Sequence, residues 1–225
     1  MKANAKLMAS AGIKLLMGLV LVGLLIFLPA GTMEYPGGWL LMAVLFVPML
    51  IAGVVMALCS PELLKKRLNA KEKEDEQKSV VAMSGILFVA AFVVAGLNYR
   101  YSWIVMPSWA VWSAVVLFLL SYAMYAEVMR ENAYMSRTIE VQEGQKVVDT
   151  GLYGVVRHPM YSATILMFLS MPLVLGSLPS FVIMLMYIPL IVKRIRNEEK
   201  VLLRGLEGYD GYCKRVRYRL LPFVW

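Results

Sequence analysis

The sequence predicts an all-α membrane protein that crosses the bilayer with about six helices. Apolar residues make up 60% of its 225 residues and charged residues 17%, whereas about a quarter of a soluble domain is charged. Long stretches without charge recur along the chain. Each is long enough to cross a hydrocarbon core of roughly 30 Å as a helix.

The first half of the chain holds four of these stretches. They are Leu15–Met33, Tyr35–Pro61, Ser79–Tyr99 and Tyr101–Ala126. Basic residues precede the first stretch, as they do in a signal peptide. It has no convincing small-residue cleavage site, however, and a second span follows within a few residues, so we expect it to be retained as a helix.

A fifth apolar stretch, Pro159–Val192, is interrupted by "GSLPS" at 176–180. Glycine and proline at this point predict a tight turn between two short helices. We therefore expect a helical hairpin, which brings the number of membrane helices to six. Five remain if the hairpin only dips into the bilayer.

Basic residues are distributed unevenly between these spans. Six lysines and arginines lie in 61–79, none lies in 31–38, and Arg100 is the basic residue between the third and fourth spans. The positive-inside rule then places the N-terminus, 61–79, 127–158 and the C-terminus in the cytoplasm. We expect a bacterial inner membrane protein that does not bind nucleic acid, since the basic residues follow membrane topology.

The chain divides by composition into a transmembrane part, 1–126, and a second part, 127–225, where polar segments flank the hairpin. Alternation in "RTIEVQEGQKVVDTG", 137–151, predicts a strand, a turn at "QEGQ" and a second strand. The charged run 65–78 predicts a solvated helix. Cys59, Cys213 and a single histidine indicate neither a disulfide framework nor a metal site.

The motif "GLYGVVRHPMY", 151–161, contains that histidine at the start of the hairpin. Pro159 favours the first turn of a helix, which places Arg157 and His158 just before its N-terminus and Tyr161 one turn inside. Free backbone N–H groups there would favour an anionic group. These residues would also serve as an ordinary topology anchor and interfacial aromatic side chains.

A second polar motif, "KRIRNEEKVLL", follows the hairpin directly. If the helix continues, Arg194, Glu198 and Leu202 share one face, with Glu199 on the next. Because a hairpin returns the chain to the side it left, the two motifs should meet and form a cytoplasmic pocket open to lipid. Its residues would be Arg157, His158, Tyr161, Arg194, Glu198 and Glu199. S-adenosylmethionine has the charge and aromatic character for such a pocket, but a nucleotide or a polar lipid headgroup would also fit.

The motifs "GQKVVDTGLYGVVRHPMY", "RNEEKVLL" and "GYDGYCKRVRYRLLPFVW" resemble the isoprenylcysteine carboxyl methyltransferase family, which is related to membrane phospholipid N-methyltransferases. The resemblance implies S-adenosylmethionine as cofactor and a lipophilic or prenylated acceptor from the bilayer lipid. Matching positions imply that the cofactor contacts Gln145, Lys146, Val147, Val148, Tyr153, His158, Pro159, Met160, Tyr161 and Glu198. They also place Arg194 beside the acceptor and Arg157 before the histidine.

The expected reaction is in-line transfer of the sulfonium methyl group, which depends on positioning and exclusion of water. Arg194 would orient a carboxylate acceptor. An amine acceptor would need a base, for which Glu199 and His158 are the candidates. The acceptor itself stays open.

Two other functions compete with this interpretation. Membrane sterol reductases, which transfer hydride from a nicotinamide cofactor, resemble the C-terminal half and carry a related Arg-His-x-x-Tyr stretch. Pro159 matches the methyltransferase form instead. A transporter would need ionisable residues within its spans, and the first four uncharged stretches contain none.

Overall fold

A computed structural model describes residues 5–68, 75–132, 134 and 141–225 of the chain. The protein is an all-helical polytopic membrane protein, as the composition predicts. Among the described residues, five helices are long and apolar enough to span a bilayer, and α6 is a shorter apolar helix. The long helices are α1 (Ala5–Ala30), α2 (Pro36–Cys59), α4 (Asp75–Tyr101) and α5 (Ser108–Glu131), together with a composite of α7 and α8.

The predicted hairpin is present. Helix α6 (Pro159–Val174) turns at Gly176, whose φ is +69°, into α7 (Leu178–Met184) and α8 (Tyr187–Gly205). The returning limb breaks at 185–186 because Pro189 has no N–H and its ring would clash with the carbonyl of Leu185. Ile188 donates to Leu185 instead, at 3.1 Å.

The fourth span begins later than the sequence predicts, at Ser108 rather than Tyr101. Residues 102–107 form a loop in which Ser102 has a φ of 49°. The side-chain amide of Asn98 holds this loop, donating to the Ile104 carbonyl at 3.0 Å and accepting from its N–H at 3.1 Å. Pro107 then stands at the N-cap of α5. Hydropathy does not detect this loop because its residues are uncharged.

The single helix predicted over the charged run 65–78 stays a prediction, because the middle of the run lies outside the described residues. Helix α3 (Pro61–Leu68) ends inside it and α4 begins at Asp75, while 69–74 lie outside the described residues. The first strand expected within 137–151 falls largely on 137–140, which also lie outside. The turn is present, with Gln145 N–H donating to the Gln142 carbonyl at 3.0 Å. The second strand is a wrong prediction, because residues 145–149 pair with no neighbouring strand in the described part.

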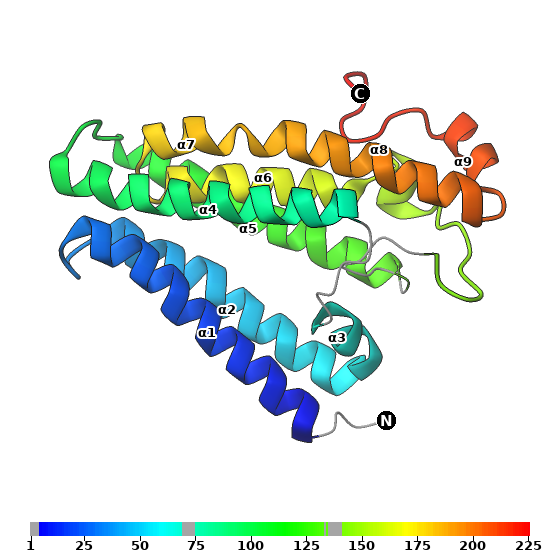
Figure 1. Ribbon diagram of the computed structural model, residues 1–225, viewed down its shortest axis with the longest axis horizontal. Helices are drawn as coiled ribbons and strands as arrows, with labels where there is room; N and C mark the ends of the chain where they lie inside the picture. The colour runs from blue at the N-terminus through cyan, green and yellow to red at the C-terminus, as the bar shows by residue number, and fades with distance from the viewer. Residues whose placement is uncertain (1–4, 69–74, 133, 135–140) are drawn as a thin grey trace.

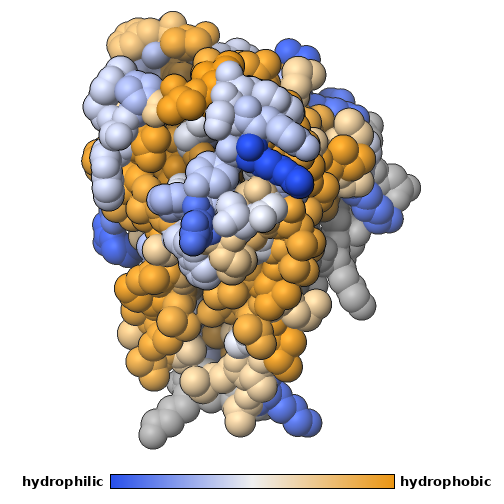
Figure 2. All heavy atoms as spheres, turned by 90° about the vertical axis from the view of Figure 1, so that its left-hand side faces the viewer, coloured by the Kyte–Doolittle hydropathy of each residue, from blue (hydrophilic) through white to orange (hydrophobic). Residues whose placement is uncertain are grey.

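The long helices run side by side, and α1 and α2 form a pair that crosses the others at an angle (Figure 1). The α1–α2, α4–α5 and α6–α7 connections lie at one end. The start of α1, helix α3, helix α9 (Tyr209–Arg215) and the C-terminal segment lie at the other (Figure 1). Figure 2 views the end with the three connections, where hydrophilic side chains gather between apolar flanks.

A close approach between α1 and α4 fixes the crossing of the helix pair. A Cβ added to Gly96 would lie 2.6 Å from the Ile26 carbonyl oxygen and 2.9 Å from the Ala30 nitrogen. Small residues let membrane helices approach in this way. The surrounding core contains Ile26, Ala30 and Ala95, all nearly inaccessible.

We predict that Gly96→Ala destabilises the protein, because overpacking of this kind costs about 1–3 kcal/mol. The measurement is the Tm of purified protein in detergent. Gly85→Ala is the matched control, since it lies on the same helix and a Cβ there meets nothing within 4 Å. Equal Tm values for the two variants would contradict the proposed close approach.

Candidate functional site

The two polar motifs meet where α6 begins and α8 continues beyond the hairpin. His158 is the N-cap of α6 and Pro159 its first residue. Tyr161, one turn inside, donates its hydroxyl to Glu198 Oε2 of α8 at 2.6 Å. The expectation that the hairpin brings these motifs together is confirmed.

Glu199 lies on a different face of α8 from Glu198 and is almost inaccessible. Its Oε1 lies 2.9 Å from Arg157 Nε and 3.3 Å from His158 Nε2, and its Oε2 accepts from Arg219 Nε at 2.8 Å. The side chains of Arg157 and Glu199 are 8% and 9% exposed. A carboxylate with these partners is a fixed structural charge, and it orients the imidazole of His158.

Arg194 links the site to α4. Its Nε donates to the Tyr161 hydroxyl at 2.9 Å, and its Nη1 donates to Gln77 Oε1 at 3.2 Å. Gln77 is 1% exposed. Tyr161 therefore accepts from Arg194 and donates to Glu198, so the chain of contacts fixes both charged groups.

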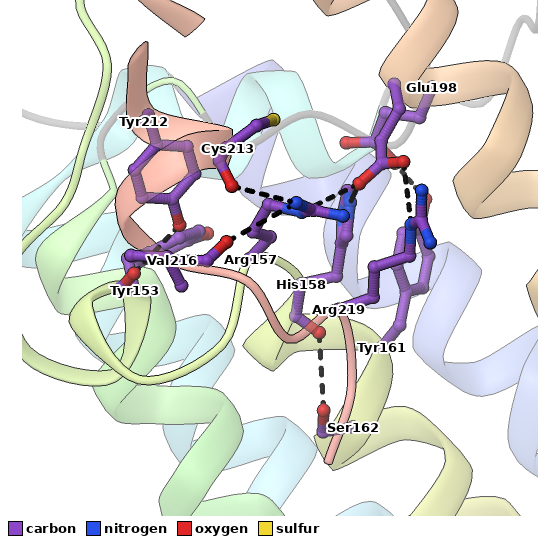
Figure 3. A network of polar contacts seen from close by, with 11 residues as sticks. Tyr153, Arg157, His158, Tyr161, Ser162, Glu198, Tyr212, Cys213, Val216 and Arg219 are labelled. Carbon is purple, nitrogen blue, oxygen red and sulfur yellow. Dashed lines mark hydrogen bonds and ion pairs between the residues drawn. The ribbon is translucent and has the colours of Figure 1, made fainter. Parts of the chain in front are cut away.

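The C-terminal segment lies across the start of α6. The N–H groups of Arg157 and His158 donate to the carbonyls of Tyr218 and Arg219, each at 2.9 Å. Arg157 also donates to the carbonyls of Cys213 and Val216, at 3.4 and 3.3 Å. Figure 3 shows Arg157 and His158 between this segment and α8. The segment thus covers the charged cluster and holds its backbone.

Tyr153 reaches the site from a short 3₁₀ helix, η1 (Gly151–Gly154). Glu131 accepts from the Leu152 N–H at 3.1 Å, and Asn132 donates to the Tyr153 hydroxyl at 2.9 Å. Gly151 has a φ of +51°, and any Cβ there would overlap the Glu131 carboxylate. Glycine is therefore required for this turn to seat Tyr153.

A cavity that opens to solvent lies between these elements. It is lined by Asn132, Tyr134, Gln145, Lys146, Val147, Val148, Tyr153, Arg157, His158, Met160, Tyr161, Arg194, Glu198, Leu202, Leu206, Tyr209 and Tyr212. A hollow at the opposite end of the molecule contains Arg100 but no carboxylate.

Most of the sequence-derived site residues line this one cavity, and Arg194, Glu198 and Leu202 share the expected face of α8. Two do not line it. Pro159 is fully buried and starts α6. Glu199 points to its cationic partners, a geometry that does not favour the role of general base considered for it.

Sequence reasoning assigned no role to several residues of the site. Asn132, Tyr134, Leu206, Tyr209 and Tyr212 line the cavity, while Gln77 and Arg219 hold its charged groups. The aromatic pair in "GYDGYCKR" was the available signal for Tyr209 and Tyr212. Gln77 carried no signal, because a glutamine at the start of a span resembles any interfacial polar residue.

Two tyrosines of the lining, Tyr153 and Tyr209, remain neutral at physiological pH. Burial raises the pKa of Tyr153 to about 12, despite the opposing hydrogen bond from Asn132. Burial also raises the pKa of Tyr209. The Tyr209 hydroxyl is buried and has no hydrogen-bond partner within the described part of the chain.

These features fit S-adenosylmethionine as a ligand. Glu198 could accept from an ammonium group or a ribose diol, and Tyr153 and Tyr161 could offer ring surface to a cation or a purine. The unpartnered Tyr209 hydroxyl would gain a hydrogen-bond partner, which a buried polar group requires. Among the described residues, no group of three or more His, Cys, Asp or Glu is placed to hold a metal ion.

The part of the chain that contains most of this site is similar to a known protein family. Residues 102–206 match the phospholipid methyltransferase family. The matched segment runs from the loop before α5 to the end of α8, so it includes Tyr161, Arg194 and Glu198. Gln77, Tyr209 and Arg219 lie outside it. The chain thus contains a segment similar to the phospholipid methyltransferase family.

Two curated relatives are reductases. The Delta(14)-sterol reductase TM7SF2 of Mus musculus is 33% identical over 91 residues, which cover 39% of this chain and 22% of the relative. The Delta(14)-sterol reductase erg24 of Schizosaccharomyces pombe is 29% identical over 90 residues, 39% of this chain and 21% of the relative. The chain spans about a fifth of the length of these relatives.

Proposed function

We propose that this protein is an S-adenosylmethionine-dependent methyltransferase that takes its acceptor from the bilayer. The observation that carries the proposal is the contact between Tyr161 and Glu198, at 2.6 Å, on the wall of the cavity. It places a carboxylate and an aromatic ring together inside the segment that matches the phospholipid methyltransferase family. The whole protein's activity and acceptor belong to the proposal.

The roles of the residues follow from their contacts. Glu198 would hold the cofactor's ammonium or ribose, and the ring of Tyr161 would lie against its charged portion. When bound, S-adenosylmethionine supplies an electrophilic methyl group on a sulfonium, and transfer leaves a neutral thioether. Residues 145–148, Tyr153 and Met160 would enclose the remaining parts and exclude water.

The geometry favours carboxyl methylation, the chemistry of the isoprenylcysteine carboxyl methyltransferase type. A carboxylate acceptor is already ionised and needs no base, and Arg194 is placed to orient it. An amine acceptor must lose a proton, but His158 and Glu199 already contact each other at 3.3 Å. Methylation of a lipid amine is the alternative within the same enzyme class.

The proposed orientation follows the positive-inside rule. The end that carries the cavity, α3 and α9 would face the cytoplasm of a bacterial inner membrane, with both termini on that side. Residues 127–225 would bind the cofactor, and 1–126 would form most of the lipid contact. The predicted partners are membrane lipid and a lipophilic or prenylated acceptor, without metal or nucleic acid.

The sterol reductase relatives support a second candidate, a hydride-transferring enzyme that uses NADPH. One experiment separates the two. We expect S-adenosylhomocysteine to raise the Tm of the purified protein in detergent, and NADPH at equal concentration to leave it unchanged, because a ligand stabilises the folded state that binds it. Stabilisation by NADPH alone would favour the reductase.

The acceptor can be found with the same preparation. Incubation with methyl-labelled S-adenosylmethionine and a total membrane lipid extract should label an apolar product. A base-labile product indicates a methyl ester, whereas a base-stable product indicates methylation of an amine. Boiled protein is the control for chemical methylation.

A further inference from the structure

The outer face of α8 carries a line of basic residues away from the cavity. Lys193, Arg196, Lys200 and Arg204 are spaced by three or four positions and therefore share one side of the helix. All four are exposed. We call Lys193, Arg196 and Lys200 the basic stripe, and we treat Arg204 separately because of its position along the helix.

No acidic side chain compensates the basic stripe in the described part of the chain. The two carboxylates of the same segment point elsewhere, Glu198 to Tyr161 and Glu199 to Arg157 and Arg219. Anionic lipids attract basic residues at the membrane surface by about 1 kcal/mol per lysine or arginine. The basic stripe therefore offers three free positive charges to a partner outside the protein.

The surface beside the basic stripe changes from apolar to polar along the helix. The residues that line a shallow groove on it are Ile188, Pro189, Val192, Lys193, Arg196, Asn197 and Lys200. Apolar residues occupy its first part and basic residues its second. The Nδ2 of Asn197 is buried without a hydrogen-bond partner among the described residues, so it adds an unused donor. This arrangement fits a molecule with an apolar body and an anionic head.

The depth of these residues relative to the bilayer indicates which kind of molecule would bind in the groove. If the hydrocarbon core ends between Val192 and Lys193, a helical rise of 1.5 Å per residue places Arg196 about 4.5 Å and Lys200 about 10 Å further out. The headgroup layer is about 5–8 Å thick on each side, and lysine side chains reach back toward it. Arg204, about 16 Å out, lies beyond that layer.

We propose that the basic stripe binds the phosphate headgroup of an anionic phospholipid whose acyl chains lie along Ile188 and Val192. The site is separate from the cavity, because it uses the opposite side of α8. It would hold the cavity end of the helix at a fixed depth in the membrane. It does not depend on the proposed methyltransferase activity.

The test compares lipid retention by the full chain and its variants. Protein is purified in detergent with equal phosphatidylglycerol and phosphatidylcholine, and retained lipid is measured by native mass spectrometry. We expect wild type to prefer phosphatidylglycerol. Each Lys→Gln or Arg→Gln change in the basic stripe should reduce that preference about fivefold, and K193Q/R196Q/K200Q should abolish it.

Arg204→Gln is the matched control, since it removes the same charge from the same side of α8 and should leave the preference intact. Stabilisation of each variant by S-adenosylhomocysteine reports independently on the cavity. The proposal is overturned if the triple variant keeps the preference, if R204Q loses it equally, or if inorganic phosphate raises the Tm of wild type as much as phosphatidylglycerol does.

Discussion

Replacing Glu198 by glutamine should weaken binding of S-adenosylhomocysteine roughly 10- to 150-fold. A hydrogen bond to a charged group contributes about 1.5–3 kcal/mol, and the change removes the charge while keeping the shape. Glutamine can still accept the Tyr161 hydroxyl through Oε1, so the fold should survive. Isothermal titration of the detergent-purified variant measures the effect.

Glu207→Gln is the matched control for this variant, because Glu207 is exposed and does not line the cavity. It removes the same charge near the same helix end, and we expect unchanged affinity. If Glu198→Gln bound S-adenosylhomocysteine as tightly as Glu207→Gln, the proposed pocket would be wrong. An unchanged Tm without ligand shows that any lost affinity is not a loss of fold.

Replacing Glu199 by leucine should destabilise the protein by about 3–5 kcal/mol, the cost of leaving a buried charge without its partner. Arg157 would lose its carboxylate while remaining nearly inaccessible, and Arg219 would no longer hold the C-terminal segment to α8. We expect the Tm to fall on the order of 10 °C. Combining Glu199→Leu with Arg157→Met should recover much of the loss.

The Tm and the turnover of Glu199→Gln, measured together, distinguish two roles for Glu199. A general base replaced by glutamine would lose turnover and keep its Tm. If Glu199 is a structural charge, its replacement should lower the Tm, and the Arg157→Met partner change should recover much of that loss. Retained stability combined with lost activity in Glu199→Gln would restore the catalytic interpretation that the sequence suggested.

Periodicity and composition determined much of the fold. Uncharged stretches locate the membrane helices because the bilayer core excludes charge, and "GSLPS" locates the turn because glycine and proline end helices. The start of α5 was missed because the loop at 102–107 is uncharged. The prediction of a second strand was wrong because alternating residues form a strand only where a neighbouring strand pairs with them.

The sequence by itself determined the membrane architecture, the hairpin and the meeting of Tyr161 with Glu198, since these follow from local rules and chain return. Only the tertiary structure decided the different roles of the two adjacent glutamates. Glu198 faces the cavity, whereas Glu199 faces Arg157, His158 and Arg219. Neighbours in sequence differ by about 100° around a helix. Which face of α8 contacts which partner depends on segments distant in sequence, here the C-terminal segment and Gln77 on α4.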